Sequence, residues 1–261
     1  MKIQPVKGTR DFYPPQMAIR NFIIDGWKAA SLRNGFEEYD GPIFEYLKMF
    51  QLKSGDEIVE QLFSLQDRGG RELAIRPEIT PTLARMVNQQ INSLAKPIKW
   101  FSVPRLCRAE RPQKGRLREF FQWNIDIIGA GDSRADAEVI FATVDYLRTV
   151  GLTPEDIKIK ISSRKLLTAA LRNFGIRTDD LNPLYTLLDK KSKLPSDTFE
   201  KLLKEQIGDE NIVKKVLEFM STEDINDVAK LVEGNFLDND IEELNDVIVC
   251  LDQMGVGNYC V

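Results

Sequence analysis

The chain has 261 residues, of which 43% are hydrophobic and 29% charged, and its net charge at pH 7 is −4. These values describe an ordinary globular protein of one large domain or two smaller ones, in which only a local basic patch could bind nucleic acid. Histidine is absent, which excludes Ser-His-Asp and Cys-His catalysis and leaves charge placement, carboxylates or an oxygen-bound metal, as in adenylyl and phosphoryl transfer.

Residues 1–16 are expected to form an extended arm, because Pro14 and Pro15 close a stretch rich in proline and glycine. The arm lacks the apolar core of a signal peptide, and no run approaches the roughly 20 apolar residues of a membrane span. Three scattered cysteines without CxxC spacing favour a reducing compartment. We therefore predict a cytoplasmic protein.

The segment Met17–Asn34 predicts a helix, since apolar residues recur there at helical spacing and Gly35 follows as a stop. The next residues, Gly35–Pro42, predict a short strand that ends at its proline. Residues 61–66 and 73–76 predict two further strands. The turn sequence DRGG joins them, which is a common hairpin signal.

The segment RPEIT, residues 76–80, leads from this hairpin into a helix through Leu83 and Val87. Glu78 lies there between a strand end and a helix start. A carboxylate at such a position either stabilises the helix N-terminus or holds a ligand cation. The local pattern leaves both interpretations open.

The stretch Trp100–Gly129, WFSVPRLCRAERPQKGRLREFFQWNIDIIG, has two segments of alternating character around a charged centre. Alternation predicts strands with two unlike faces, and a loop with Pro112 and Gly115 joins them as an antiparallel hairpin. One face is apolar and should pack on a core. The opposite face would present Arg108 and Glu110 from the first strand, and Phe120, Gln122, Asn124 and Asp126 from the second.

This opposite face suits a small zwitterion together with a nucleotide, because arginine binds carboxylate and phosphate in bidentate fashion. The loop adds Arg111, Lys114, Arg116 and Arg118, enough positive charge for a polyphosphate without a Walker-type glycine loop. Charged hairpin tips also occur merely as solubilising features. The pattern alone does not decide between a binding surface and a solvated hairpin.

The run CRAERPQKGRLREFFQWNIDIIG closely resembles the second signature motif of class II aminoacyl-tRNA synthetases, in its histidyl-tRNA synthetase form. The segments GTRDFYPP and RPE resemble other parts of that family, and the resemblance is strong through about Gly151 and weaker beyond. It implies an α+β fold, in which helices flank an antiparallel sheet and a mostly helical region follows. The helix over 17–34 with its strand resembles the first motif, which builds the family's dimer interface.

The resemblance implies ATP-dependent activation of histidine to an adenylate and transfer of the amino acid to tRNA(His), with Mg²⁺ bridging the phosphates. Arg108 would be the catalytic residue that clamps the α-phosphate and draws off developing negative charge. For the rest of ATP, Glu110 would read the adenine amino group, Phe120 would stack on the base and Arg116 would contact the outer phosphates. No residue stands out as a dedicated metal ligand.

For the amino acid, the resemblance implies that Glu78, Thr80 and Gln122 hold the amino group and that Asp126 faces the imidazole. The expected partners are histidine, ATP, tRNA(His) and a second copy of the chain. The chain is also similar to the non-catalytic regulatory subunit of ATP phosphoribosyltransferase, which works in histidine biosynthesis and has no need of the phosphate-clamping loop. A dimerisation module with a relic site is a third interpretation.

Two domains are expected, the front part of a catalytic core over residues 1–165 and a helical region resembling the family's insertion over 166–261. A helix should follow Gly129, and residues 156–162 alternate like a strand that returns to the sheet. Four amphipathic stretches then predict short helices, at 163–175, 196–208, 211–221 and 224–234. Their lysine-rich faces suit either solvent or tRNA.

The sequence ends at CLDQMGVGNYCV. In the family, this point precedes the histidine-binding segment Arg-Gly-Leu-x-Tyr-Tyr, the third motif with its ATP-binding arginine and the anticodon-binding domain. By the resemblance, the chain is the N-terminal catalytic portion of a synthetase. We therefore expect it to be nearly inactive by itself.

Overall fold

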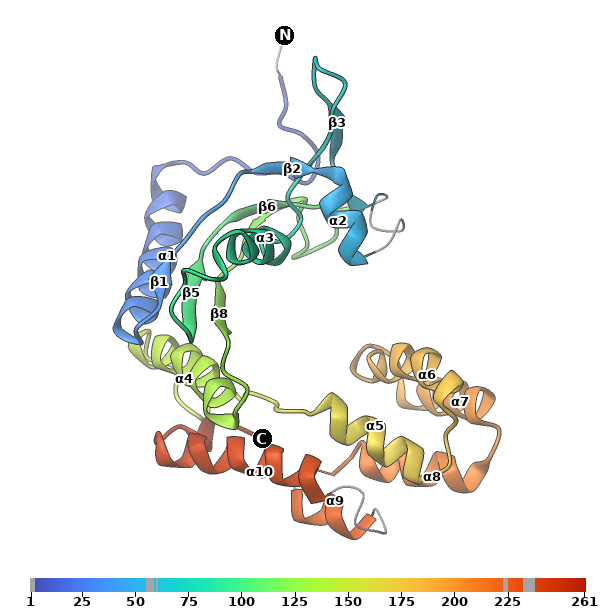
Figure 1. Cartoon of the computed structure of the whole chain (residues 1–261). Helices are drawn as coiled ribbons and strands as arrows, with labels where there is room; N and C mark the ends of the chain where they lie inside the picture. Colours follow the sequence, from blue (N-terminus) through green and yellow to red (C-terminus); the bar gives the residue numbers. More distant parts are fainter. Residues whose placement is uncertain (1–2, 55–58, 60, 223–224, 232–237) are drawn as a thin grey trace. The chain divides into compact units, whose positions relative to one another are not determined.

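The computed structural model describes residues 3–54, 59, 61–222, 225–231 and 238–261. The fold is α+β, as the sequence predicts, and the chain divides into two compact units (Figure 1). The first unit contains residues 1–131 and 142–151, and the second contains residues 132–141 and 152–261. The domain boundary expected after residue 165 stays a prediction.

The first unit holds three small sheets. One contains β1 (Glu37–Glu38), β5 (Ile98–Ser102) and β8 (Asn124–Ile128), a second contains β2 (Phe44–Tyr46), β4 (Glu72–Ile75) and β3 (Ser64–Gln66), and a third contains β6 (Arg105–Cys107) and β7 (Glu119–Phe121). All pairings are antiparallel except that of β1 with β5. The hairpin predicted around the DRGG turn is confirmed by β3 and β4.

Among the described residues, the helices that belong wholly or partly to this unit are α1 (Pro14–Arg33), α2 (Leu47–Ser54), α3 (Thr80–Gln90) and α4 (Ser133–Thr149). The prediction that Pro14 and Pro15 stay in the arm is wrong, because α1 begins at Pro14. Proline is well suited to the first helical turn, where its fixed φ is helical and its missing N–H has no partner to lose. Asp132 caps α4 by accepting hydrogen bonds from the backbone N–H groups of Arg134 and Ala135.

One register runs through both antiparallel pairs of the long hairpin. Each step along β5 and β6 is matched by one step back along β7 and β8, from the pair Ile98 and Ile128 to the pair Cys107 and Glu119. Between the two pairs, Gln122 N donates to Pro104 O at 3.3 Å, and beyond them Arg108 N donates to Arg118 O at 2.8 Å. Residues 98–108 and 118–128 therefore form one hairpin without a bulge.

Because directly paired residues point to the same side of a sheet, this register gives the hairpin two faces. The even-numbered residues of 98–108 and 118–128 form one, which we call the even face, and the odd-numbered residues form the odd face. Phe120, Gln122, Asn124 and Asp126 thus share a face, as their alternation predicts.

The odd face packs against α1 and the residues of α4 that belong to this unit. Phe101 is fully buried against Phe36 and Ala142. Trp123 stacks on Trp27 with ring centroids 5.8 Å apart, and its Nε1 donates to Ser31 Oγ at 2.9 Å. The predicted packing of this face on a core is confirmed, and the indole nitrogen of Trp123 has a hydrogen-bond partner within that core.

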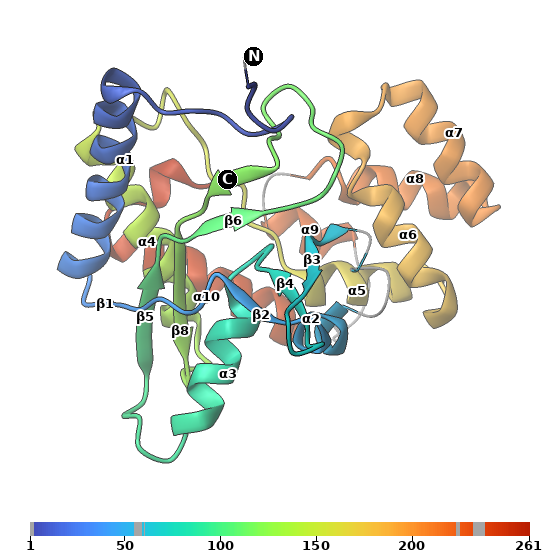
Figure 2. The ribbon, with the colours of Figure 1, turned by 90° about the horizontal axis from the view of Figure 1, so that it is seen from above.

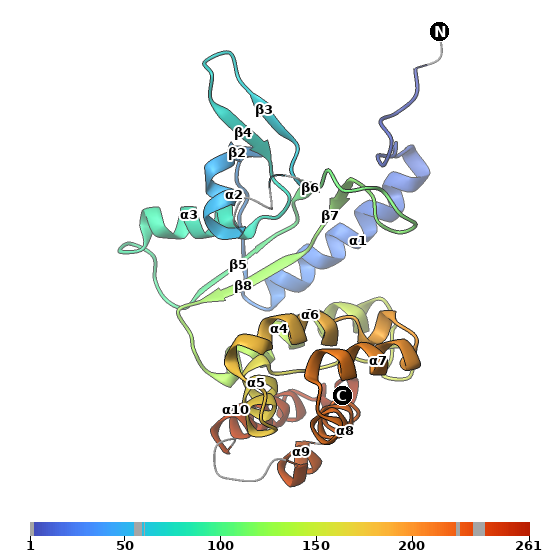
Figure 3. The same ribbon diagram turned by 90° about the vertical axis from the view of Figure 1, so that its right-hand side faces the viewer.

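Part of the even face packs against α3, which lies on the side of β5 and β8 opposite to α1 (Figure 3). The contact joins Ile98 at the start of β5 to Leu83 and Val87 of the helix. Further along the hairpin, toward the loop, the even face carries polar and charged side chains. The helix therefore covers one end of this face.

The second unit is mostly helical and has its own core, as the sequence predicts. Its elements are α5 (Arg164–Asn173), η2 (Thr178–Asp180), α6 (Leu181–Leu188), η3 (Lys191–Lys193), α7 (Ser196–Ile207), α8 (Glu210–Phe219), α9 (Ile225–Leu231), α10 (Asp238–Gln253) and η4 (Gly257–Tyr259). The first three predicted helices correspond to α5, α7 and α8, and the fourth to α9 over 225–231, since residues 224 and 232–234 of that prediction lie outside the described residues. The helices α6 and α10 were not predicted. No helix in the described part of the chain is long and apolar enough to cross a membrane.

The strand predicted over 156–162 is wrong. This segment makes only an isolated parallel bridge, between Ile159 and Cys260. Its hydrogen bonds run to the end of the sequence, from Ile159 N to Tyr259 O at 2.7 Å and from Ile161 N to Val261 O at 2.8 Å. Alternation correctly predicted extended backbone, but the partner is a segment at least 100 residues away that carries no strand signal of its own.

Candidate functional site

Arg108 lies at the loop end of the even face. Its Cζ is 5.1 Å from the ring centroid of Phe120, and its Nε donates to Pro77 O at 3.3 Å. These two contacts fix the plane of the guanidinium. Arginine has five N–H donors, and within the described part of the chain only the Nε–H of Arg108 is used, so its terminal nitrogens are left for an anion.

The segment that carries Glu78 runs beside the hairpin, since Cys107 N donates to Arg76 O at 3.0 Å. Together with the bond from Arg108 to Pro77, this places Glu78 next to Arg108. Glu78 Oε2 accepts from Lys53 Nζ at 2.7 Å. Because an ammonium group already reaches this carboxylate, Glu78 is accessible to an amino group.

Arg76 ties this segment to its neighbours. Its side chain is almost fully buried and its Nη1 contacts Asp40 Oδ1 at 2.6 Å. It also donates to Gly41 O and, through Nε, to Arg105 O. A buried guanidinium without such partners would be strongly destabilising. Arg76 therefore holds together three segments that border the even face.

The charged loop binds the N-terminal arm (Figure 2). Arg118 N donates to Gly8 O at 2.8 Å, and Arg118 Nε donates to Glu110 O at 3.2 Å. Gly8 has a φ of +87°, and a Cβ there would lie 2.7 Å from Pro112 Cγ, so only glycine fits this approach. At the loop tip, Arg116 Nη2 pairs with Glu110 Oε2 at 2.6 Å.

Farther along the even face lies a group of buried polar atoms. Asn124 Oδ1, Asp126 Oδ2 and Tyr39 Oη are buried, and none has a hydrogen-bond partner within the described residues. Burial raises the pKa of the Asp126 carboxyl above its usual value. Burial also raises the pKa of Tyr39 strongly, with the nearby charges of Asp126 and Asp40 adding to the effect. Buried polar atoms are rarely left unpaired in native proteins, so these three atoms are candidates for contact with a ligand.

The structure thus brings some predicted site residues together and leaves others apart. Glu78, Arg108 and Phe120 form one group, while Glu110 and Arg116 form another at the loop. Asp126 and the exposed Gln122 share the face with Phe120. Thr80 is exposed as the first residue of α3.

No hydrogen bond or ion pair joins Gln122 or Asp126 to Glu78 or Thr80 in the described part of the chain. The four residues predicted to bind histidine are therefore not joined by direct contacts with one another across these two pairs.

Sequence reasoning missed Lys53 and Tyr39. Both reach the site through pairings between distant segments, the ion pair with Glu78 and the parallel contact of β1 with β5. Neither residue carries a local pattern that could have identified it.

The described residues contain no group of three or more Asp, Glu or Cys side chains that could hold a metal ion. No residue is therefore assigned to Mg²⁺, and none of the steps proposed below depends on it.

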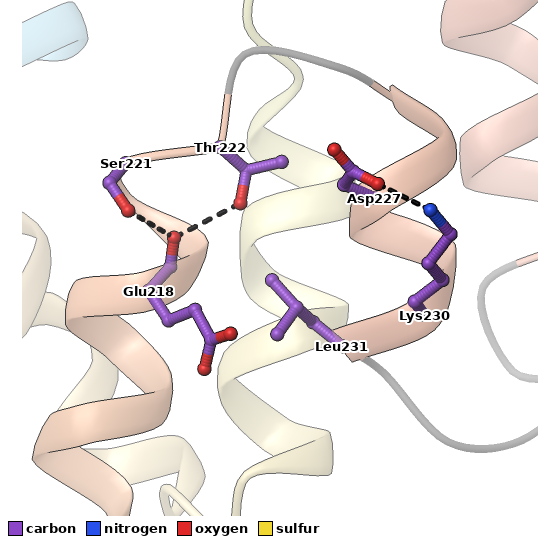
Figure 4. Close-up of a pocket in the computed structure, with 6 residues that line it drawn as sticks. All are labelled: Glu218, Ser221, Thr222, Asp227, Lys230 and Leu231. Atoms are coloured by element: carbon purple, nitrogen blue, oxygen red, sulfur yellow. Dashed lines mark hydrogen bonds and ion pairs between the residues drawn. The ribbon is translucent and has the colours of Figure 1, made fainter.

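The second unit contains a hollow of about 390 Å³ (Figure 4). It is lined by Glu218, Ser221, Thr222, Asp227, Lys230 and Leu231. The hydroxyls of Ser221 and Thr222 donate to Glu218 O, and Lys230 Nζ donates to Asp227 Oδ1. These polar groups pair locally at helix ends, whereas the even face holds unpaired ones. The even face is therefore the candidate functional site.

Comparison with known proteins shows which family the chain resembles. The family profile described as histidyl-tRNA synthetase matches residues 8–256. A chloroplastic/mitochondrial histidine–tRNA ligase of Arabidopsis thaliana is 38% identical over 232 residues, which are 89% of this chain and 48% of the relative. A histidine–tRNA ligase of Opitutus terrae is 42% identical over 83% of this chain and 50% of the relative. The chain spans about half the length of these curated relatives.

Solved structures share the fold. The chain matches a histidyl-tRNA synthetase from Nostoc sp. with a TM-score of 0.87 at 19% identity, covering all of this chain and 61% of that one. It matches an ATP phosphoribosyltransferase regulatory subunit/histidyl-tRNA synthetase from Bacillus halodurans with a TM-score of 0.85 at 22% identity, covering all of this chain and 67% of that one.

The α+β fold is that of solved histidyl-tRNA synthetase structures, and the family match places the chain in the class II aminoacyl-tRNA ligases. Within that class, the profile match over most of the chain shows that it belongs to the histidyl-tRNA synthetase family.

Proposed function

We propose that the protein to which this chain belongs activates histidine with ATP and transfers it to tRNA(His). The observation that carries the proposal is the unbroken register of the hairpin, which puts Arg108, Phe120 and Asp126 of the family motif on one face. A guanidinium, a ring and a half-buried carboxylate on one surface suit a nucleotide and a cationic or N–H-bearing side chain.

In the first step, a carboxylate oxygen of histidine attacks the α-phosphorus of ATP, the bond to the bridging oxygen breaks and pyrophosphate leaves. Arg108 would hold the α-phosphate and stabilise the negative charge that grows on it, because its plane is fixed before the reaction. In the second step, a terminal ribose hydroxyl of tRNA attacks the carbonyl of the adenylate and AMP leaves.

The ATP would lie toward the loop. Phe120 would stack on the adenine, Glu110 would accept from its amino group and Arg116 would contact the outer phosphates. In this placement the ion pair between Glu110 and Arg116 opens when ATP binds, because both side chains have to turn toward the ligand. The bridging of the phosphates by Mg²⁺ belongs to the family expectation, and the residues described here supply no ligand cluster for it.

The histidine would lie between the start of α3 and β8. Its amino group would replace the ammonium of Lys53 at Glu78, with Thr80 and Gln122 as further partners. Its imidazole would face Asp126. A site built around such a buried carboxylate rejects amino acids without ring N–H groups, because they leave it unpaired.

The remaining elements of the proposal concern partners. A homodimer is supported by exposed apolar residues on α1, among them Ile19 and Phe22, at 64% and 65% exposure. We further propose tRNA(His) as the acceptor near the basic loop. The cytoplasm is the proposed compartment, although the name of the plant relative points to an organelle for that protein.

The direct test is histidine-dependent exchange of pyrophosphate into ATP by the full-length protein. We expect exchange with histidine and none with the other amino acids, and little exchange by the 261-residue chain alone. Absence of exchange from the full-length protein with every amino acid would contradict the proposal.

A second function is favoured by one observation, the likeness to the Bacillus halodurans protein whose name includes a regulatory subunit of ATP phosphoribosyltransferase. Under this alternative, the full-length protein would make no adenylate but would restore activity to a phosphoribosyltransferase partner. The charged loop with Glu110, Arg111 and Arg116 favours the ligase, since a regulatory subunit has no phosphates to clamp.

A further inference from the structure

The unpaired polar atoms on the even face come from two strands on opposite sides of β5. Asn124 and Asp126 belong to β8, whereas Tyr39 follows β1 at the other edge of the sheet. Of the three residues that carry these atoms, only Asp126 has a role in the function proposed above. Tyr39 and Asn124 have no role in it.

The backbone brings Tyr39 onto the even face. β1 pairs in parallel with β5, with Glu37 beside Trp100 and Glu38 beside Phe101. The ladder continues through Tyr39 N, which donates to Phe101 O at 2.9 Å. In this register Glu37 and Tyr39 point to the same side as Trp100. Trp100 Nε1 donates to Glu37 Oε2 at 3.3 Å, as expected for side chains on one face.

The ring of Tyr39 contacts that of Trp100 on β5. Its ring centroid lies 5.7 Å from that of Trp100, the residue directly paired with Asp126. The tyrosine is only 7% exposed, yet its hydroxyl has no hydrogen-bond partner within the described residues. The negative charge of Asp126 contributes to the raised pKa of Tyr39, which agrees with their proximity.

We infer that Tyr39 and Asn124 belong, with Asp126, to the subsite that reads the ring nitrogens of the substrate side chain. The inference rests on the proposed function and adds two specificity-determining residues to it. A carboxylate oxygen, an amide oxygen and a phenolic hydroxyl thus share the even face, where Asp126 is paired with Trp100, Asn124 with the adjacent even-face residue Ser102, and the ring of Tyr39 contacts that of Trp100. A flat ring with two nitrogen atoms suits this set, because its N–H can donate to the carboxylate or to the amide oxygen and its unprotonated nitrogen can accept from the hydroxyl of Tyr39.

The arrangement also explains why these atoms are unpaired in the chain itself. A buried polar atom without a partner costs about 1–3 kcal/mol, so three of them would be selected against in a merely structural core. Phenylalanine at position 39 and leucine at position 124 would keep the branching of the side chains without that cost. Polar groups at these positions are therefore explained by a ligand that pairs with them.

The test uses Tyr39→Phe in the full-length protein, a change that keeps the ring and removes only the hydroxyl. We expect the Michaelis constant for histidine in pyrophosphate exchange to rise about five- to tenfold, as for the loss of one hydrogen bond, while that for ATP stays unchanged. Asn124→Ala should act in the same direction. The control is Tyr146→Phe, which removes a phenolic hydroxyl from the odd-face core, near Trp123, and should leave both constants unchanged.

A double-mutant cycle separates substrate contact from a structural role. If Tyr39 and Asp126 bind one ring, the effect of Tyr39→Phe should largely disappear in an Asp126→Asn background. An equal factor in both backgrounds, a parallel rise for ATP or no change at all would overturn the inference. If the unmutated protein neither binds nor activates histidine, the proposed function fails as well. If the unmutated protein binds and activates histidine but Tyr39→Phe leaves the Michaelis constant for histidine unchanged, only the inference fails.

Discussion

The two faces of the long hairpin use the same two strands in different ways. On the odd face, Trp123 is stacked on Trp27 and its indole N–H is paired with a buried serine. On the even face, one residue further along, Asn124 carries a buried oxygen without a partner. Trp123 thus has its polar partner inside the chain, whereas Asn124, like Asp126, carries a buried oxygen that has no partner within the described residues. The comparison predicts that substitutions on the odd face change stability and those on the even face change activity.

The largest effect is expected on the odd face. Trp123→Ala removes a stacked ring and leaves a cavity beside Trp27, so the free energy of unfolding should fall by about 3–5 kcal/mol. Denaturant unfolding followed by circular dichroism measures this change. Gln122→Ala is the matched control, because its exposed side chain belongs to the other face, and it should change stability by less than about 0.5 kcal/mol. Similar losses from both variants would remove the distinction between the faces.

On the even face, Arg108→Lys keeps the charge but loses the planar fork that meets the α-phosphate. Loss of one preorganised donor costs about 10²–10³ in rate, so we expect histidine-dependent exchange by the full-length protein to drop at least about tenfold, with the fold and the dimer unchanged. Arg105→Lys, on the odd face, serves as the control and should retain exchange. Full activity of the Arg108 variant would remove this residue from the chemistry.

The pKa of Asp126 connects activity with stability. Burial raises it in the folded protein, so the folded state holds this proton more tightly than the unfolded state. The resulting stability is fully present below the unfolded pKa of about 4 and is lost as the pH rises through the folded pKa.

Asp126→Asn abolishes this titration. It should therefore gain stability over the parent between about pH 4 and pH 7, while its Michaelis constant for histidine rises much more than that for ATP. Thermal unfolding across this pH range, together with exchange kinetics, checks both. A variant that is less stable than the parent at pH 7 but not at pH 4 would contradict the sign.

The smallest effect concerns Lys53, whose ammonium competes with the substrate for Glu78. The side chains of Lys53 and Glu78 are 44% and 27% exposed, and such pairs contribute about 0.2–1 kcal/mol. Lys53→Met should accordingly tighten histidine binding about two- to fivefold, as measured by calorimetry. Lys48→Met on the same helix should have no effect. Weaker binding by the Lys53 variant would mean that this lysine contacts the substrate instead.

The sequence predicted those features of the fold that depend on residues close together along the chain. Alternation through Phe120, Gln122, Asn124 and Asp126 gave the even face, and a loop of limited length fixed the hairpin register. The amphipathic stretches of the second unit gave four of its helices for the same reason.

The rest depends on pairings between distant segments. Tyr39 reaches Asp126 only because β1 joins β5 in parallel, and Lys53 reaches Glu78 through the placement of α2. The segment 156–162 alternates like a strand but finds a bridge to Cys260 instead of a sheet. Local patterns carry no information on these partners.

The most direct test of the division between the faces uses two adjacent phenylalanines. Phe120 lies on the even face under Arg108, and Phe121 lies on the odd face, with the Cζ atoms of Arg20 and Arg105 each 5.0 Å from its ring centroid. Each is changed to alanine in the full-length protein, and the Michaelis constant for ATP and the free energy of unfolding are measured for both. We predict that Phe120→Ala raises the constant and that Phe121→Ala lowers the stability while exchange persists. Equal effects of the two variants on both quantities, or the reverse pattern, would contradict it.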